Sequence, residues 1–136
     1  MPHTTNYLAF DLGASSGRAV IGRFSGSTLD LEEIHRFSNR AIELPGGLYW
    51  DVVGLFGEIL SGLRKAASTA GGLKSTGLDT WGVDYALLDR SGELIGIPHC
   101  YRDPRVDGVM DEAFKVVPQD DIFEKTGIQF MPFNTL

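Results

Sequence analysis

Cysteine is almost absent from this chain, since Cys100 is the single one among its 136 residues. One cysteine excludes an internal disulfide and leaves no cysteine set for a zinc site. Long apolar runs are absent too: no segment approaches the ~20 apolar residues that cross a bilayer. Residues 1–6 also lack the apolar stretch of a secretory signal peptide. We therefore predict a cytoplasmic protein.

Basic residues are few and scattered. The sequence has 12 lysines and arginines against 18 aspartates and glutamates, which gives a formal net charge of −6. Strong nonspecific binding to nucleic acid needs many cations that neutralise phosphates, and anionic membrane surfaces attract the same cations. The composition thus disfavours nucleic acid and membranes as partners, and it leaves the oligomeric state open. A hydrophobic content of 43% predicts a folded chain with one compact core.

Apolar runs and turn residues predict a three-stranded antiparallel meander at the N-terminus. The runs lie at residues 7–12, 18–24 and 29–37, and the turns between them are rich in glycine and serine. The alternation of the third run slips, which predicts a β-bulge near Glu32 and Glu33.

A helix is expected after the meander. Asp51 is a suitable N-cap, apolar residues repeat at helical spacing from Val52 to Ala67, and Gly71 ends the helix. The remaining expected elements are strands at 75–80, 84–89 and 93–97 and helices at 104–117 and 120–126.

This order of elements predicts an α/β fold of the ribonuclease H-like class, which actin-like ATPases share. Three antiparallel strands, a crossover helix and a strand parallel to the first form its βββαβ core, a mixed sheet with flanking helices. A fold does not define a function, so the function has to be argued from a site.

The strongest chemical signal is the run DLGASSGR at residues 11–18, between the first two strands. A tight turn of small residues directs successive backbone N–H groups into a concavity that suits phosphate oxygens. Asp11, at the end of a strand, suits a magnesium ion held through water. Neither the P-loop motif nor the dinucleotide-binding motif occurs. An ordinary hairpin whose serines satisfy their own backbone is the competing interpretation.

The same run resembles the first phosphate motif of the FGGY carbohydrate kinases. Three further segments agree with that family in order, namely LDTWGVD at 78–84, YRDPR at 101–105 and TGIQFMPFNT at 126–135. The resemblance covers essentially the whole chain, and it implies ATP-dependent phosphorylation of a ketose with ATP and Mg²⁺ as cofactors. DLGASSGR together with DTWGVD favours L-rhamnulose, while L-fuculose and xylulose stay open.

The resemblance also implies roles for single residues. The ATP phosphates are expected at Ala14, Ser15, Ser16, Gly17 and Arg18, next to Asp11, whose metal role is expected from its place at the strand end. Gly82 is expected to lie against the ketose, in a pocket also lined by Trp81, Asp84 and Arg102.

At several of these positions a purely structural role is the alternative to a functional one. Core packing is the alternative for Trp81, helix capping is favoured for Asp103, and a solvated strand end is favoured for Asp79. We interpret His35, His99 and Cys100 as surface or packing residues without companions.

The resemblance implies a two-lobed clamp in which ATP and sugar meet between the lobes. The aspartate that accepts the proton of the sugar hydroxyl, and the adenine-binding segments, are expected beyond this stretch, and no residue here matches that base. We expect residues 1–136 to be an incomplete N-terminal kinase domain without useful activity by itself. The apolar stretch just before Leu136 favours a cut there.

Two readings from other classes remain. A nuclease on the same core would place Asp11, Glu58 and Asp79 around two metal ions, but the acidic balance offers nucleic acid no basic groove. An actin-like sensor would use ATP as a conformational ligand and would ignore the sugar.

Overall fold

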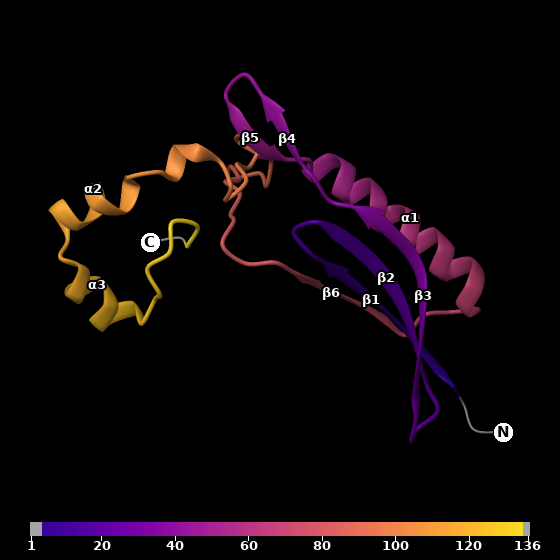
Figure 1. Ribbon diagram of the computed structural model, residues 1–136. Helices are drawn as coiled ribbons and strands as arrows, with labels where there is room; N and C mark the ends of the chain where they lie inside the picture. The colour runs from indigo at the N-terminus through magenta and orange to yellow at the C-terminus, as the bar shows by residue number, and fades with distance from the viewer. Residues whose placement is uncertain (1–3, 135–136) are drawn as a thin grey trace. The chain divides into compact units, whose positions relative to one another are not determined.

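The computed structural model describes residues 4–134. Its elements, in chain order, are β1 (Thr5–Leu12), β2 (Ser16–Phe24), β3 (Leu29–Ser38), β4 (Ala41–Leu44), β5 (Gly47–Trp50), α1 (Val52–Ala70), β6 (Ser75–Thr80), the 3₁₀ helix η1 (Pro104–Val106), α2 (Val109–Val116) and α3 (Gln119–Thr126) (Figure 1). None of the helices in this described range is long and apolar enough to cross a membrane.

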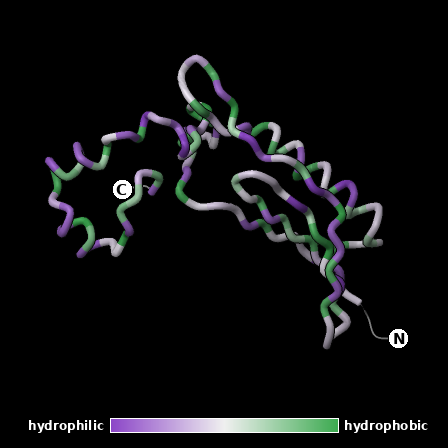
Figure 2. Tube along the Cα trace, viewed as in Figure 1, coloured by the Kyte–Doolittle hydropathy of each residue, from purple (hydrophilic) through white to green (hydrophobic). Residues whose placement is uncertain are grey.

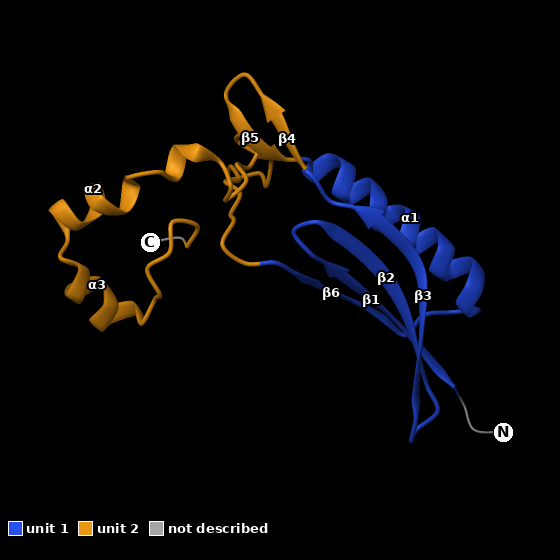
Figure 3. Ribbon diagram, in the orientation of Figure 1, with its two compact units in different colours: residues 1–40, 51–81 blue, residues 41–50, 82–136 orange. Residues whose placement is uncertain are grey.

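The chain forms two compact units (Figure 3). The first comprises residues 1–40 and 51–81 and contains the larger sheet and α1. The second comprises residues 41–50 and 82–136 and contains the β4–β5 hairpin, η1, α2 and α3.

The sheet of the first unit has the strand order β3-β2-β1-β6. β2 runs antiparallel to both β1 and β3, while β6 runs parallel to β1. Because parallel neighbours need a crossover connection, α1 lies between them in sequence. The predicted βββαβ core and its mixed sheet are thereby confirmed.

A β-bulge interrupts the pairing of β2 with β3. The partner of Ala19 is His35, whereas the partner of Val20 is Glu33, so Ile34 is the extra residue. The β-bulge predicted near Glu32 and Glu33 is confirmed, and its extra residue, Ile34, directly follows Glu33. The extra residue restores the alternation that the sequence had lost.

The core of the first unit lies between the sheet and α1. Alternate residues of the strands point to the same face, and the buried cluster comprises Leu8, Phe10, Leu12, Ala19, Ile21, Phe37 and Ala66. Figure 2 shows hydrophobic segments in β1 and β2 and a recurrence of polar residues along α1. Full burial of one leucine or phenylalanine side chain stabilises a fold by about 1.5–3 kcal/mol.

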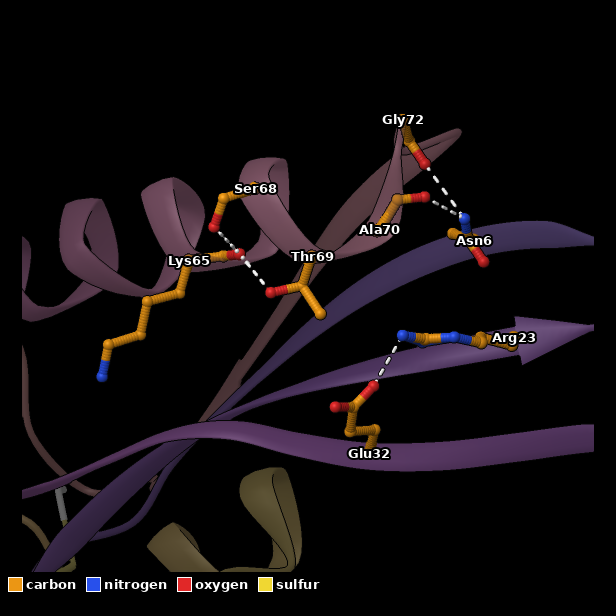
Figure 4. A network of polar contacts seen from close by, with 8 residues as sticks. All are labelled: Asn6, Arg23, Glu32, Lys65, Ser68, Thr69, Ala70 and Gly72. Carbon is orange, nitrogen blue, oxygen red and sulfur yellow. Dashed lines mark hydrogen bonds and ion pairs between the residues drawn. The ribbon is translucent and has the colours of Figure 1, made fainter.

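Both ends of α1 are capped as predicted. The Asp51 carboxylate accepts a hydrogen bond of 2.8 Å from the Gly54 amide, and Gly71 adopts a left-handed conformation with φ of 66°. The Asn6 side chain then ties the end of the helix to β1, because its Nδ2 donates to the carbonyls of Ala70 (2.6 Å) and Gly72 (3.3 Å) (Figure 4).

The hairpin of β4 and β5 was not predicted from the sequence. Its strands pair from Ala41↔Trp50 to Leu44↔Gly47, so Pro45 and Gly46 form a two-residue turn. Pro-Gly between two apolar stretches is a turn signal. The short strands gave too little alternation to reveal the rest.

The strands predicted at 84–89 and 93–97 are wrong. Only the turn forms, with an isolated bridge between Leu88 and Leu94 and hydrogen bonds from Asp89 N to Glu93 O (2.8 Å) and from Ile95 N to Leu87 O (3.0 Å). Leu87, Leu88 and Ile95 are exposed. A hairpin with no buried face is too weak to extend a ladder.

The helix predicted at 104–117 is divided in two. η1 ends at Val106 and α2 begins at Val109, because Gly108 between them takes a left-handed conformation with φ of 76°. The helix predicted at 120–126 is confirmed as α3, which ends at Gly127 with φ of 65°.

Candidate functional sites

The loop between β1 and β2 closes on itself in the first unit. The Gly13 amide donates to the Ser16 carbonyl at 2.9 Å, and the Leu12 carbonyl accepts from the Trp81 amide at 3.0 Å. Among residues 4–134, the amides of Ala14 and Ser15 have no hydrogen-bond partner, and Ser15 is exposed. Two consecutive unpaired N–H groups are the arrangement that binds anions such as phosphate.

Gly17 has a packing role within this segment. A Cβ atom at Gly17 would lie 2.3 Å from Cζ of Phe37, which belongs to the buried cluster. The core therefore requires a glycine here, whatever binds at the loop. Ser16 begins β2 and is half-buried.

Asp11 and Arg18 form an ion pair beside the loop. They are partners in the β1–β2 ladder, and both Nε (2.8 Å) and Nη2 (2.7 Å) of Arg18 contact Oδ2 of Asp11. Both side chains are about half exposed, so water weakens the pair and a ligand can compete for either member.

A second arginine, Arg36, lies across from Arg18 in β3. It contacts Glu33 through Nε and Nη2, and this contact holds the pKa of the Glu33 carboxyl below its usual value and that of the Arg36 guanidinium above it. The charge of Asp11 also contributes to the raised pKa of Arg36. Sequence reasoning missed Arg36, because only the register of the ladder places it beside Arg18.

The donor set at Asp11 suits magnesium bound through water. Asp79 is its partner on the parallel strand β6, so two carboxylates lie side by side on one face of the sheet. Within residues 4–134, no group of three or more His, Cys, Asp or Glu side chains is placed to hold a metal ion.

Glu58 does not join the two aspartates. Its carboxylate contacts Nε2 of His35 at 2.6 Å, and Lys65 Nζ lies 2.8 Å from Nδ1 of the same ring. The interpretation of His35 as a residue without companions is therefore wrong: it connects β3 to two residues of α1. The acids that a nuclease would need are not assembled.

A pocket of about 250 Å³ lies in the second unit. Tyr101 and Phe133 supply aromatic walls and meet edge to face at 6.0 Å between ring centroids. Val106, Val109 and Met110 add apolar surface, and Asp84, His99 and Arg105 supply charged or polar groups. A mostly apolar hollow with a few polar groups is typical of a small-molecule site.

Asp84 is held in this pocket by a buried tryptophan. The indole Nε1 of Trp50 donates to Oδ2 of Asp84 at 2.7 Å, and Trp50 is 2% exposed. The Trp50 ring also lies 6.4 Å from that of Tyr101. The neighbouring Val83 has φ of 70°, which is rare for a β-branched residue and is found most often at functional sites.

The other residues predicted for the sugar do not line this pocket. Trp81 belongs to the first unit and packs, partly buried, against the core cluster. Arg102 is exposed, with its guanidinium 4.7 Å from the ring centre of Tyr101. Gly82 is exposed, and no atom lies within 4 Å of the position of an added Cβ, so packing gives no reason for a glycine there.

Asp103 is a helix cap, as favoured from the sequence. Its Oδ1 accepts from the Arg105 amide at 2.7 Å, and its Oδ2 accepts from the Leu48 amide. These two N–H donors, with a smaller contribution from His99, hold the pKa of the buried carboxyl below its usual value. Asp103 thus joins the start of η1 to β5.

His99 and Cys100 differ in their surroundings. His99 stacks on Tyr49 at 4.2 Å, lies 3.5 Å from Asp103 and lines the pocket, so its interpretation as a residue without companions is wrong. Cys100 is buried, and its burial raises the pKa of the thiol, in keeping with a packing role. Sequence reasoning missed His99, Tyr101, Arg105 and Phe133 as pocket residues, although Tyr101 and Phe133 lie within the segments that carried the resemblance.

No family model matches the sequence. Curated relatives do: the chain is 48% identical over 133 residues to a rhamnulokinase of Mannheimia succiniciproducens and 44% identical over 131 residues to one of Bacteroides thetaiotaomicron. Each match covers 96% of this chain but only 28% and 27% of the relative. The chain therefore spans little more than a quarter of the length of these proteins.

Solved structures agree in fold. A Plasmodium falciparum glycerol kinase with ADP matches 97% of this chain at a TM-score of 0.78 and 17% identity, and covers 27% of that enzyme. A gluconate kinase of Lactobacillus acidophilus matches 96% of this chain at a TM-score of 0.76 and 14% identity, with 26% of that chain covered. At such identities the likeness concerns the fold alone.

The fold is thus the one shared by sugar and polyol kinases, in agreement with the predicted class. In sequence, the chain resembles the matched segment of rhamnulokinases along almost its whole length.

Proposed function

We propose that this chain is part of an ATP-dependent kinase that converts L-rhamnulose to L-rhamnulose 1-phosphate. The observation that carries the proposal is an identity of 44–49% with four curated rhamnulokinases over 95–96% of the chain. Since the substrate ATP is abundant in the cytoplasm, we place the enzyme there.

The loop after β1 is assigned to the phosphates of ATP. The amides of Ala14 and Ser15 would donate to phosphate oxygens, with the hydroxyls of Ser15 and Ser16 and the Arg18 guanidinium beside them. Asp11 would hold Mg²⁺ through water, and the bound ion would neutralise charge on the phosphates. Binding requires Arg18 to share its contact with Asp11 between carboxylate and phosphate.

The pocket of the second unit is assigned to the ketose. Asp84, whose Oδ2 accepts from the Trp50 indole, would also accept a hydrogen bond from a sugar hydroxyl, while Tyr101 and Phe133 would offer ring surface to the C–H groups. Gly82 would let the sugar approach the backbone, with Trp81 and Arg102 as further members of the site. We assign binding and orientation, not proton transfer, to this chain.

The experiment that tests the proposal is a chimeric kinase. The 133 matched residues of the Mannheimia enzyme are replaced by those of this chain, and phosphorylation of L-rhamnulose, L-fuculose and D-xylulose is measured with MgATP. We expect L-rhamnulose to have the highest kcat/KM. A folded chimera that prefers another ketose, or phosphorylates none, contradicts the proposal.

Two matched serine variants locate the nucleotide in that chimera. Ser15→Asp places a negative charge at the loop assigned to phosphate, whereas Ser27→Asp places the same charge in the exposed turn between β2 and β3. We expect the first to raise the KM for ATP about tenfold or more, since like charges repel at close range. The second should leave it unchanged.

A further inference from the structure

Asn39 is a buried polar residue that follows β3. It is 3% exposed, and its contacts reach far back along the chain. Its Nδ2 donates to the Gly13 carbonyl at 2.8 Å, and its backbone amide donates to the Ser15 carbonyl at 3.0 Å. One residue thus binds two carbonyl groups of the loop between β1 and β2.

These two bonds complete a division of the loop into paired carbonyls and unpaired amides. The carbonyls of Leu12 and Ser16 accept from the amides of Trp81 and Gly13, so with Asn39 four of the five carbonyls from Leu12 to Ser16 are occupied. The amides of Ala14 and Ser15 have no partner among the described residues.

This division decides what the loop presents to a ligand. Carbonyl oxygens repel an anion and N–H groups attract it, and a loop of this length has backbone groups of both kinds. A donor that holds the carbonyls on the protein side prevents a peptide flip that would turn them toward the ligand. Burial strengthens this restraint, since an unpaired polar group in the interior is costly.

We propose that Asn39 is a positioning residue for ATP binding: its Nδ2 holds the Gly13 carbonyl, and with it the Ala14 N–H of the same peptide group, so that this N–H faces the phosphates, while its backbone amide keeps the Ser15 carbonyl turned away from them. This inference rests on the proposed function of the loop. Asn39 acts through the loop and has no contact with substrate assigned to it.

Asn6 supplies a matched control for the test. Its Nδ2 also donates to backbone carbonyls, those of Ala70 and Gly72, but it fastens the end of α1 instead of the phosphate loop (Figure 4). Substitution of either asparagine removes a side-chain donor from a backbone carbonyl. Of these acceptors, only the Gly13 carbonyl, which Asn39 binds, belongs to the candidate site.

The test compares Asn39→Asp, Asn39→Ala and Asn6→Asp in the chimeric kinase described above. We expect both Asn39 variants to raise the KM for ATP about tenfold, as loss of a buried hydrogen bond implies, and to leave the KM for L-rhamnulose within twofold. Asn6→Asp should lower the melting temperature without changing either KM. Asn39→Ala keeps the test valid where the buried charge of Asn39→Asp prevents folding.

The outcomes separate this inference from the proposed function. An unsubstituted chimera that folds but phosphorylates no ketose overturns the proposed function itself. If the unsubstituted chimera is active and the Asn39 variants keep the KM for ATP within twofold, the role of Asn39 is overturned alone. The role of Asn39 is also overturned if its variants raise the KM for ATP and the KM for L-rhamnulose together. It is overturned as well if Asn6→Asp raises the KM for ATP as much as the Asn39 variants do. In either case Asn39 would act on stability only.

Discussion

Asp103 is a buried side chain whose charge is stabilised by backbone N–H groups. The donors from Leu48 and Arg105 favour the ionised form and lower the pKa of the carboxyl. A carboxyl whose folded pKa lies below its unfolded value of about 3.9 adds stability above that pH. This stability is lost as the pH falls through the lower, folded pKa.

We therefore expect the second unit to unfold more easily in urea at pH 2.5 than at pH 6. Asp103→Asn should lower the urea midpoint at pH 6, because the NH₂ group of the new asparagine cannot accept a hydrogen bond from the backbone N–H that it faces. The substitution should also make the urea midpoint depend less on pH. The measurement is the NMR signal of the Trp50 indole N–H during urea titration. Asp107→Asn, on an exposed residue at the end of η1, is the control; an equal effect there contradicts the assignment.

A second prediction at the residue scale concerns Asp84. Asp84→Asn removes the negative charge of the acceptor assigned to a sugar hydroxyl, and hydrogen bonds to charged groups are the stronger ones. In the chimeric kinase we expect the KM for L-rhamnulose to rise about tenfold and the KM for ATP to stay constant.

Asp89→Asn is the control for this change. Asp89 accepts from the amides of Ser91 and Glu93 within a surface turn outside the pocket. Asp89→Asn should leave the KM for L-rhamnulose and the KM for ATP within twofold of those of the unsubstituted chimera. A sugar KM that Asp84→Asn does not change excludes Asp84 from the ketose site.

At the scale of single elements, the glycines of α1 differ according to the face on which they lie. A Cβ at Gly62 would stand 2.6 Å from Cε1 of Phe10 and 3.1 Å from Cβ of Ala19, whereas a Cβ at Gly57 meets nothing within 4 Å. Gly62 lets the helix approach the sheet, and Gly57 only weakens the helix. Helix propensity and core packing thus oppose each other at Gly62 and do not at Gly57.

We expect Gly57→Ala to raise the free energy of unfolding by about 0.5–1 kcal/mol, through higher helix propensity. Gly62→Ala should lower it by about 1–3 kcal/mol, because the extra methyl overpacks the core against Phe10. Urea unfolding followed by circular dichroism measures both. A stabilising Gly62→Ala would show that α1 does not approach the sheet this closely.

The elements also show where sequence patterns reach their limit. Alternation predicted strands at 84–89 and 93–97, yet no layer covers them, and pairing stays confined to the turn. Alternation was too short to reveal β4 and β5, which pair fully. A strand needs a partner and a buried face, and neither is encoded within the strand itself.

At the scale of the whole molecule, the length of the chain limits its activity. It covers 27–28% of its curated relatives, and phosphoryl transfer requires nucleophile, phosphate and metal to be aligned in one site. We therefore expect the 136-residue chain alone to consume no ATP above background with L-rhamnulose, in a coupled assay of ADP release. Turnover by the isolated chain would contradict this, and the active chimera is the positive control.

The sequence by itself determined the features that depend on local chemistry. These are the buried strands, the caps at Asp51 and Gly71, and the small residues after β1, each of which follows from propensity or from turn geometry over a few neighbouring positions. The tertiary structure alone decided which distant groups meet. Trp50 donates to Asp84 and Asn39 to Gly13 across 34 and 26 residues. Such contacts depend on how the intervening chain folds back, because the sequence near each residue is compatible with many partners.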